Sequence, residues 1–232
     1  MASTDLLWCI VPAAGSGRRF GSGIPKQYLP LAGKPMLECT LDRLAACREI
    51  AGLMVVLADG DAYWPGIDAM RGKPVRTATG APERSGSVLA GLRALPAEVG
   101  ADDFVLVHDA ARPCIAADDV AMLVARGAAA GGALLAAPVR DTLKRAGNER
   151  RVIATEPREM LWRAMTPQMF RRGELTRALE AAENDGIAVT DEAMAMESAG
   201  HRPMLIEGAE DNIKVTTAAD LALAAYLLRQ AP

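Results

Sequence analysis

Short apolar runs alternate with segments of helical periodicity over the first 139 residues of the chain. Alternation of this kind is typical of βα units, in which helices pack around a mainly parallel sheet. We expect strands at 6–11, 53–58, 74–79, 104–107 and 133–139. We expect the helices between them at 36–47, 84–95 and 118–130.

The pattern changes after the fifth expected strand. The stretch 140–155 holds two short alternating runs around Gly147 and Asn148, a turn-prone pair, and is rich in arginine and lysine. We therefore interpret 139–160 as a projecting β-hairpin arm. The remaining expected elements are helices at 174–183 and 218–229, a helix start at Thr190 and a strand near 203–207. With no linker or repeat, 1–232 is predicted to be a single Rossmann-like α/β domain with a mainly parallel twisted sheet.

Composition narrows the class of protein. Half of the residues are apolar, as in a globular chain with a sizeable core, and the formal net charge is −3. This charge gives no general attraction to nucleic acid or to an anionic membrane, so any phosphate site must come from a local basic cluster. The start of the chain lacks a basic segment, and its apolar run is broken by Pro12, so a signal peptide or transit peptide is not expected. The four cysteines form no C-x-x-C pair, and a reducing cytoplasm is expected.

A glycine-rich and arginine-rich loop follows the first expected strand. It reads Pro12-Ala13-Ala14-Gly15-Ser16-Gly17-Arg18-Arg19-Phe20-Gly21, with Pro25-Lys26-Gln27 soon after. Open α/β sheets bind ligands at the carboxyl ends of their strands, and small residues let main-chain N–H groups approach a phosphate. Arg18, Arg19 and Lys26 add cations that a tight turn alone does not need. The loop predicts a triphosphate site, and a flexible surface loop with solvated arginines is the alternative.

Two familiar phosphate-binding motifs are excluded by spacing. A dinucleotide fingerprint that starts at Gly15 needs glycine at the position of Phe20. The P-loop pattern needs a second glycine five residues after the first, followed by lysine, and no glycine of this loop meets that condition. A nicotinamide oxidoreductase is therefore disfavoured.

Asp109 follows the fourth expected strand, three residues before Arg112. A carboxylate at this end of a strand can hold Mg²⁺, or another divalent cation such as Mn²⁺, which prefers one or two carboxylates together with phosphates and waters. Arg112 can clamp a phosphate with two parallel hydrogen bonds. An ordinary surface Asp–Arg pair is the alternative interpretation.

The two histidines, His108 and His201, are interpreted as structural, because neither is near a serine or cysteine arrangement for nucleophilic catalysis. A phosphate monoester that acts as the nucleophile is largely ionised at neutral pH and needs no general base. Such a reaction needs cations to stabilise the charge on the phosphates, and the loops supply them.

Several further runs lie in the same order as in a known family. They are Glu83-Arg84-Ser85-Gly86-Ser87-Val88, Val107 to Pro113, Asp141-Thr142-Leu143-Lys144, Leu161 to Gln168, Thr190-Asp191-Glu192 and Asn212 to Thr216. With the glycine-rich loop they resemble the 2-C-methyl-D-erythritol 4-phosphate cytidylyltransferases over nearly the whole chain. The resemblance implies a nucleotidyltransferase fold and a transfer of CMP from CTP to methylerythritol phosphate, with release of pyrophosphate, in the non-mevalonate isoprenoid route.

The resemblance also implies roles for individual residues. It implies that Arg19, Lys26, Arg158 and Lys214 are catalytic. It implies nucleotide contacts by Pro12, Ala13, Ala14, Gly15, Gly17, Gly80, Ala81 and Ser87. It implies acceptor contacts by Asp109, Arg112, Thr142, Arg158, Thr166, Thr190 and Lys214, with Asp109 near the metal. In that family the arm is exchanged between two subunits, so a homodimer is expected, in which Thr142 and Arg158 serve the neighbouring site.

One departure from the family pattern bears on the base. Family members carry two glycines before the Glu-Arg run, where this chain has Gly80-Ala81-Pro82, and the added methyl group lies close to the expected cytosine pocket. A relative that acts on ribitol 5-phosphate or another sugar phosphate is the nearest alternative.

The stretch 140–177 holds ten basic and five acidic residues. Because it has only two aromatic residues for base stacking, we interpret it as a solvated arm and not as a nucleic-acid surface.

Overall fold

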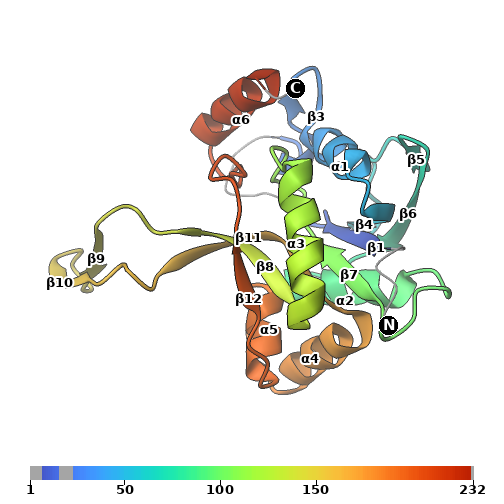
Figure 1. The fold of residues 1–232 in the computed structure, drawn as a ribbon. Helices are drawn as coiled ribbons and strands as arrows, with labels where there is room; N and C mark the ends of the chain where they lie inside the picture. Colours follow the sequence, from blue (N-terminus) through green and yellow to red (C-terminus); the bar gives the residue numbers. More distant parts are fainter. Residues whose placement is uncertain (1–6, 16–22, 231–232) are drawn as a thin grey trace.

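An eight-stranded twisted sheet forms the centre of the molecule (Figure 1). The structure is a computed structural model that describes residues 7–15 and 23–230. The strands are β1 (Leu7–Pro12), β4 (Ile50–Leu57), β5 (Ala69–Met70), β6 (Lys73–Thr79), β7 (Phe104–Val107), β8 (Ala133–Pro138), β11 (Trp162–Arg171) and β12 (Met204–Glu207). Their order across the sheet is β12-β8-β11-β7-β1-β4-β6-β5. The strands expected from the apolar runs are therefore confirmed, and the fold is the mixed α/β arrangement that they predicted.

Most neighbouring strands of the sheet are parallel. β1 pairs in parallel with β4 and β7, and the pairs β4–β6 and β12–β8 are also parallel. β11 runs antiparallel between β7 and β8, and sequence analysis did not predict it. Its alternation is interrupted at Pro167, where the register with β8 shifts between Ala164 and Gln168. Proline within a sheet is confined to edges and irregular positions, so this segment did not show the regular pattern of a strand.

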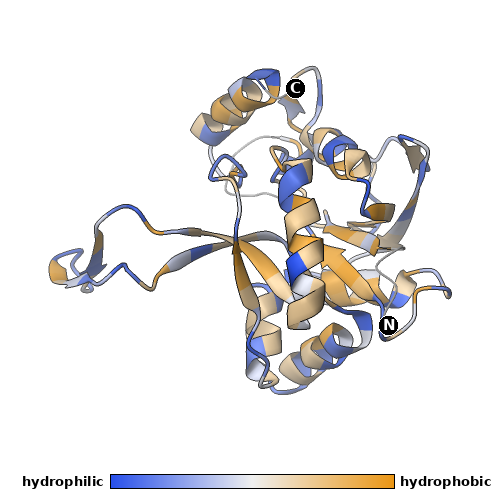
Figure 2. Cartoon of the chain, viewed as in Figure 1, coloured by the Kyte–Doolittle hydropathy of each residue, from blue (hydrophilic) through white to orange (hydrophobic). Residues whose placement is uncertain are grey.

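Helices cover both faces of the sheet. The helices are α1 (Met36–Ala46), α2 (Arg84–Ala94), α3 (Ala117–Ala130), α4 (Arg172–Asn184), α5 (Glu192–Ser198) and α6 (Ala218–Gln230). Alternate residues of β1 enter different clusters, since Cys9 packs with the residues of α1 and α3, whereas Ile10 packs with those of α2 and α4. In Figure 2 the strands between these helices are the most hydrophobic part of the chain. The sheet is therefore buried on both sides, as continuous apolar strands predict.

Two smaller elements and the last helix complete the site end of the molecule. The 3-10 turn η2 (Lys26–Tyr28) precedes a short hairpin of β2 (Pro30–Leu31) and β3 (Lys34–Pro35). Under α6, a third cluster joins Leu31 and Cys114 to Val215 and Ala224. The segment between β12 and α6 is therefore fixed against the loop that follows β7. Among the described residues, no helix combines the length and apolar character that a transmembrane span requires.

The predicted hairpin arm is present and extends away from the sheet (Figure 1). β9 (Leu143–Ala146) and β10 (Val152–Glu156) pair antiparallel, and the N–H of Gly147 donates to the carbonyl of Arg151 across the turn. The side chains of Val152 and Ile153 near its tip are 63% and 67% exposed. The tip of this mostly polar arm therefore carries exposed apolar side chains.

The contact of α2 with the sheet leads to the first prediction. A Cβ atom added at Gly91 would lie 2.7 Å from Cγ2 of Ile10 and 2.8 Å from Cγ2 of Val56. These β-branched side chains have little rotational freedom, so the helix must move away from the sheet. We expect Gly91→Ala to lower the free energy of unfolding by about 1–2 kcal/mol, despite its better helix propensity. Urea denaturation should show this loss, whereas Gly23→Ala, with no atom within 4 Å of the added Cβ, should leave the unfolding midpoint unchanged.

Candidate active site

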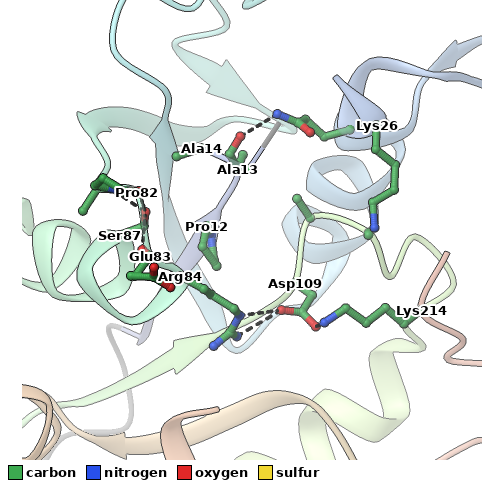
Figure 3. Close-up of a pocket in the computed structure, with 15 residues that line it drawn as sticks. Pro12, Ala13, Ala14, Lys26, Pro82, Glu83, Arg84, Ser87, Asp109 and Lys214 are labelled. Carbon is green, nitrogen blue, oxygen red and sulfur yellow. Dashed lines mark hydrogen bonds and ion pairs between the residues drawn. The ribbon is translucent and has the colours of Figure 1, made fainter. Parts of the chain in front are cut away.

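A cavity of about 290 Å³ opens at the carboxyl ends of β1 and β7 (Figure 3). The residues that line it are Pro12, Ala13, Ala14, Gly15, Lys26, Gln27, Ala81, Pro82, Glu83, Arg84, Ser87, Asp109, Ala110, Ala111 and Lys214. They come from the loop after β1, from η2, from the start of α2, from the loop after β7 and from the segment before α6. The cavity therefore unites the two strongest sequence signals, the glycine-rich loop and Asp109.

The loop at Ala13, which lines the cavity, and the loop at Gly80, which adjoins it, are both held close to the sheet. The N–H of Ala13 donates to the carbonyl of Val56, and the side-chain amide of Gln27 donates to the carbonyl of Ala13 at 2.6 Å. A Cβ atom at Gly80 would lie 2.6 Å from Cβ of Ala14 and 2.8 Å from Oγ of Ser87. Glycine is therefore required at position 80 to bring these two loops together.

Ser87 fixes the loop that departs from the family pattern. Its hydroxyl accepts a hydrogen bond from the N–H of Ala81 at 3.0 Å, and Oγ also lies 3.0 Å from the carbonyl of Ala81 and 3.2 Å from that of Glu83. The Ala81 methyl group faces Gly86, where an added Cβ would lie only 2.9 Å from it. The extra methyl group of this chain is thus accommodated by a glycine in the first turn of α2.

Asp109 lies among three cations at the base of the cavity. Its Oδ1 atom is 3.0 Å from Nη2 of Arg84, and its Oδ2 atom is 2.9 Å from Nζ of Lys214 and 3.5 Å from Nε of Arg112. Burial alone would raise the pKa of Asp109, but the positive charges, that of Arg84 above all, outweigh it and hold the pKa well below its ordinary value. The carboxylate is therefore ionised at every physiological pH.

Arg84 and Glu192 belong to the site, although sequence analysis assigned no role to either. Arg84 donates to both carboxylate oxygens of Glu192, at 2.6 and 3.1 Å, and Glu192 is fully buried. Burial opposes the charge of Arg84, but the attraction of Glu192 and then of Asp109 exceeds it and raises the pKa of Arg84. The only sequence signal was that both residues stand in the Glu83 and Thr190 runs that carry the family resemblance.

Lys26 and Lys214 lie on the side of the cavity opposite Arg84 (Figure 3). Nζ of Lys26 donates to the carbonyl of Val215 at 2.7 Å, and the N–H of Val215 donates to the carbonyl of Ala111. The side chain of Lys214 remains 44% exposed although it contacts Asp109. Both ammonium groups are thus placed where an anionic ligand in the cavity can meet them.

Thr166 and Arg112 adjoin Asp109 without lining the cavity. The N–H of Asp109 donates to Oγ1 of Thr166, and the side-chain amide of Asn212 donates to the carbonyl of Thr166. Arg112 donates to the carbonyl of Asn212 at 2.7 Å, so part of its guanidinium group is already hydrogen-bonded within the protein. In this arrangement the two residues support Asp109.

The other residues singled out from the sequence lie elsewhere. Thr142 and Arg158 are on the arm, where Arg158 donates to the carbonyl of Arg140, and neither lines the cavity of its own chain. Thr190 precedes α5, and its hydroxyl contacts the sulfur of Met194 at 3.4 Å. The predicted helix start is confirmed, because Asp191 caps α5 by accepting from the N–H of Met194. Gly17 and Arg19 lie outside the described residues.

His108 is buried beside this site and leads to the second prediction. Its ring nitrogens lie 3.1 Å from Oγ1 of Thr166 and 3.0 Å from the carbonyl of Arg112, and burial lowers its pKa to about 4. In the unfolded chain, His108 therefore binds a proton near pH 6.5, whereas in the folded chain it binds one only near pH 4. The free energy of unfolding should therefore decrease as the pH is lowered through this window. His108 contributes at most about 1.4 kcal/mol per pH unit to this decrease.

Urea denaturation across that window measures the effect. The wild-type chain should lose stability more steeply than His108→Gln, which has no proton to bind. His201→Gln, at an exposed position, is the matched control and should follow the wild type. Equal slopes for wild type and His108→Gln would contradict the prediction.

Comparisons with known proteins show the family of the chain. A family model described as 2-C-methyl-D-erythritol 4-phosphate cytidylyltransferase matches residues 7–230. Proteins of that name from Xanthomonas euvesicatoria pv. vesicatoria and Stenotrophomonas maltophilia are 60% and 58% identical to the chain. The first match covers 94% of this chain and 83% of the relative, and the second covers 93% of each.

Solved structures give the same result. A crystal structure of 4-diphosphocytidyl-2C-methyl-D-erythritol synthase superposes with a TM-score of 0.82 at 35% identity, and covers 95% of this chain and 97% of the other. The Francisella tularensis 2-C-methyl-D-erythritol 4-phosphate cytidylyltransferase superposes with a TM-score of 0.80 at 32% identity, and covers 95% and 98%. The chain therefore belongs to the 2-C-methyl-D-erythritol 4-phosphate cytidylyltransferase family, and is a nucleotidyltransferase.

Proposed function

We propose that this enzyme transfers CMP from CTP to 2-C-methyl-D-erythritol 4-phosphate, giving 4-diphosphocytidyl-2-C-methyl-D-erythritol and pyrophosphate, in isoprenoid biosynthesis by the non-mevalonate route. The observation that carries the proposal is the cavity itself. In a chain of this family, it brings a small-residue loop and two lysines to one buried carboxylate. Ribitol 5-phosphate is not favoured as the acceptor, because the relatives named above carry the methylerythritol phosphate name.

The chemistry of the proposed reaction suits these side chains. An oxygen of the acceptor phosphate attacks the α-phosphorus of CTP, and the bond between that phosphorus and the oxygen leading to the β-phosphorus breaks. Pyrophosphate leaves with the electron pair of this bond. The attacking phosphate is already ionised, so no side chain must take a proton from it. What the reaction requires is positive charge around the phosphates and correct placement of the two reactants.

We assign the roles of the residues accordingly. Lys26, with Arg19 from outside the described residues, stabilises the charge that builds on the transferred phosphoryl group and on pyrophosphate. Lys214 places the acceptor. The proposed nucleotide contacts are Pro12, Ala13, Ala14, Gly15, Gly17, Gly80, Ala81 and Ser87. The proposed acceptor contacts are Asp109, Arg112, Thr166, Thr190 and Lys214, with Thr142 of the partner subunit and Arg158 of the partner subunit.

Mg²⁺, or another divalent cation such as Mn²⁺, is part of the proposal. Among the described residues no cluster of three acidic, histidine or cysteine side chains could hold a metal by itself. Asp109 offers one carboxylate in the cavity, which fits an ion that takes its remaining ligands from phosphates and water. Bound there, the ion would add positive charge beside the triphosphate.

Pyrophosphate release tests the function and supplies the third prediction. The enzyme with Mg²⁺ and CTP should release pyrophosphate only when 2-C-methyl-D-erythritol 4-phosphate is present, and ribitol 5-phosphate, UTP or ATP should not replace their counterparts. Lys26→Met should lower kcat by about 10²-fold or more, because it removes charge stabilisation from the transition state. Lys34→Met, a half-exposed lysine outside the cavity, is the control and should keep wild-type turnover. No release with any acceptor would reject the function.

The arm at 139–160 is proposed to join two copies of the chain. Met160, at its base, is 87% exposed, and Val152 and Ile153 expose apolar side chains near the tip. Many of its arginines face acids, as in the pairs Arg145–Glu156 and Arg151–Glu149, so little net positive charge is available to nucleic acid. In a homodimer of this kind, the arm brings Arg158 to the cavity of the partner subunit. A cytoplasmic location, which the four free thiols suit, belongs to the same proposal.

Mixing two defective variants tests the exchange of arms, and is the fourth prediction. Lys26→Met damages the cavity of its own subunit, whereas Arg158→Ala damages the cavity that its arm enters. If the arm serves the partner, each mixed dimer has one intact site, and an equimolar mixture should recover about a quarter of the wild-type activity. If each arm serves its own subunit, every site keeps one defect and mixing restores nothing. Sedimentation of the mixture confirms that dimers are present.

A further inference from the structure

Glu192 is a fully buried acid that the proposed reaction does not yet use. It stands in the first turn of α5, where Asp191 caps the helix. Gln168 of β11 fixes this turn to the sheet, because its side chain donates to the carboxylate of Asp191 at 3.0 Å and accepts from the N–H of Ala193 at 2.7 Å. The carboxylate of Glu192 is therefore held in one place by the backbone that carries it.

Arg84 connects this buried acid to the cavity. Its two Nη atoms contact the two oxygens of Glu192, and its Nε atom donates to Oδ1 of Asp109 at 3.0 Å. A planar guanidinium group can engage two carboxylates along two of its edges, which the point charge of a lysine cannot do. Arg84 is thus a rigid spacer between Glu192 and Asp109.

Asp109 is oriented from both sides by this arrangement (Figure 3). Arg84 contacts its Oδ1 atom and Lys214 contacts its Oδ2 atom, so a row of four alternating charges crosses the cavity from α5 to the segment before α6. Without an acid behind it, Arg84 would be attracted to the phosphates of a nucleotide and would leave Asp109. Glu192 balances the charge of Arg84 and keeps the guanidinium group of Arg84 in contact with the carboxylate of Asp109.

We infer that Glu192 is a positioning residue for the transfer reaction, which acts through Arg84 to hold the carboxylate of Asp109 between the nucleotide and the acceptor. The inference rests on the proposed function and adds to it a determinant outside the cavity. Glu192 itself touches neither reactant. Its contribution should therefore appear in the rate of transfer and depend on the presence of arginine at position 84.

The experiment compares three variants with wild type. Glu192→Gln keeps the size of the side chain and removes its charge, and should lower kcat about tenfold or more while the KM for CTP changes less than about threefold. Glu197→Gln removes an exposed acid from the same helix and should leave both constants unchanged. Arg84→Lys should lower kcat by at least as much as Glu192→Gln, because lysine cannot span the two acids. Circular dichroism at the assay temperature establishes that each variant is folded.

A double-variant cycle separates positioning from a structural role. If Glu192 acts through Arg84, adding Glu192→Gln to Arg84→Lys should cause little further loss of kcat. Equal kcat for folded Glu192→Gln and Glu197→Gln, or losses that multiply in the double variant, would overturn the inference. If Glu192→Gln does not fold, Glu192→Asp, which keeps the charge on a shorter side chain, replaces it in the same cycle with the same criteria.

Failure of the proposed function and failure of the inference about Glu192 would give different results. Wild-type pyrophosphate release reports on the function, and the cycle on the position of Asp109. If the wild-type protein releases no pyrophosphate, the proposed function fails, and the cycle is measured by calorimetry on the affinity for Mn²⁺, the ion that Asp109 is proposed to hold. There, weaker binding by Glu192→Gln with no additional loss in the double variant would support the coupling. Unchanged binding by both single variants would overturn it.

Discussion

A buried carboxylate among three cations is the interaction on which the candidate site depends. A charge removed from water is tolerated only when opposite charges or hydrogen bonds replace the solvent, and Asp109 obtains them from Arg84, Arg112 and Lys214. These partners come from α2, from the loop after β7 and from the segment before α6. Satisfying one acid therefore draws three separate parts of the chain together, and the cavity is the space that they enclose.

The same arrangement divides the work of the cavity between main chain and side chains. The loops at Ala13 and Gly80 approach closely because small residues permit it, and Ser87 fixes the main chain that faces the proposed base. In the proposed complex, the cationic side chains of the cavity contact the phosphates. His108 does not line the cavity, and both of its ring nitrogens bond within the protein, so it is not placed to act as a general base. An acceptor phosphate that is ionised in water makes such a group unnecessary.

In the proposed homodimer, residues of the arm belong to a site without lying near it in their own chain. The paired strands β9 and β10 extend into solvent with apolar side chains exposed. Exchange of arms would cover these side chains and complete the acceptor side of each cavity at once. Assembly and catalysis would then depend on the same segment of about twenty residues.

The sequence by itself determined the alternation of strands and helices, the hairpin arm, the glycine-rich loop and the place of Asp109 at a strand end. These features depend on local spacing, which a single chain displays directly. It did not predict β11, because Pro167 breaks the alternation there, and it gave no role to Arg84 or Glu192. Those two residues are 108 positions apart, and no local pattern records that they meet. Only the packing of α2 and α5 on one face of the sheet brings their charges together, and with them the orientation of Asp109.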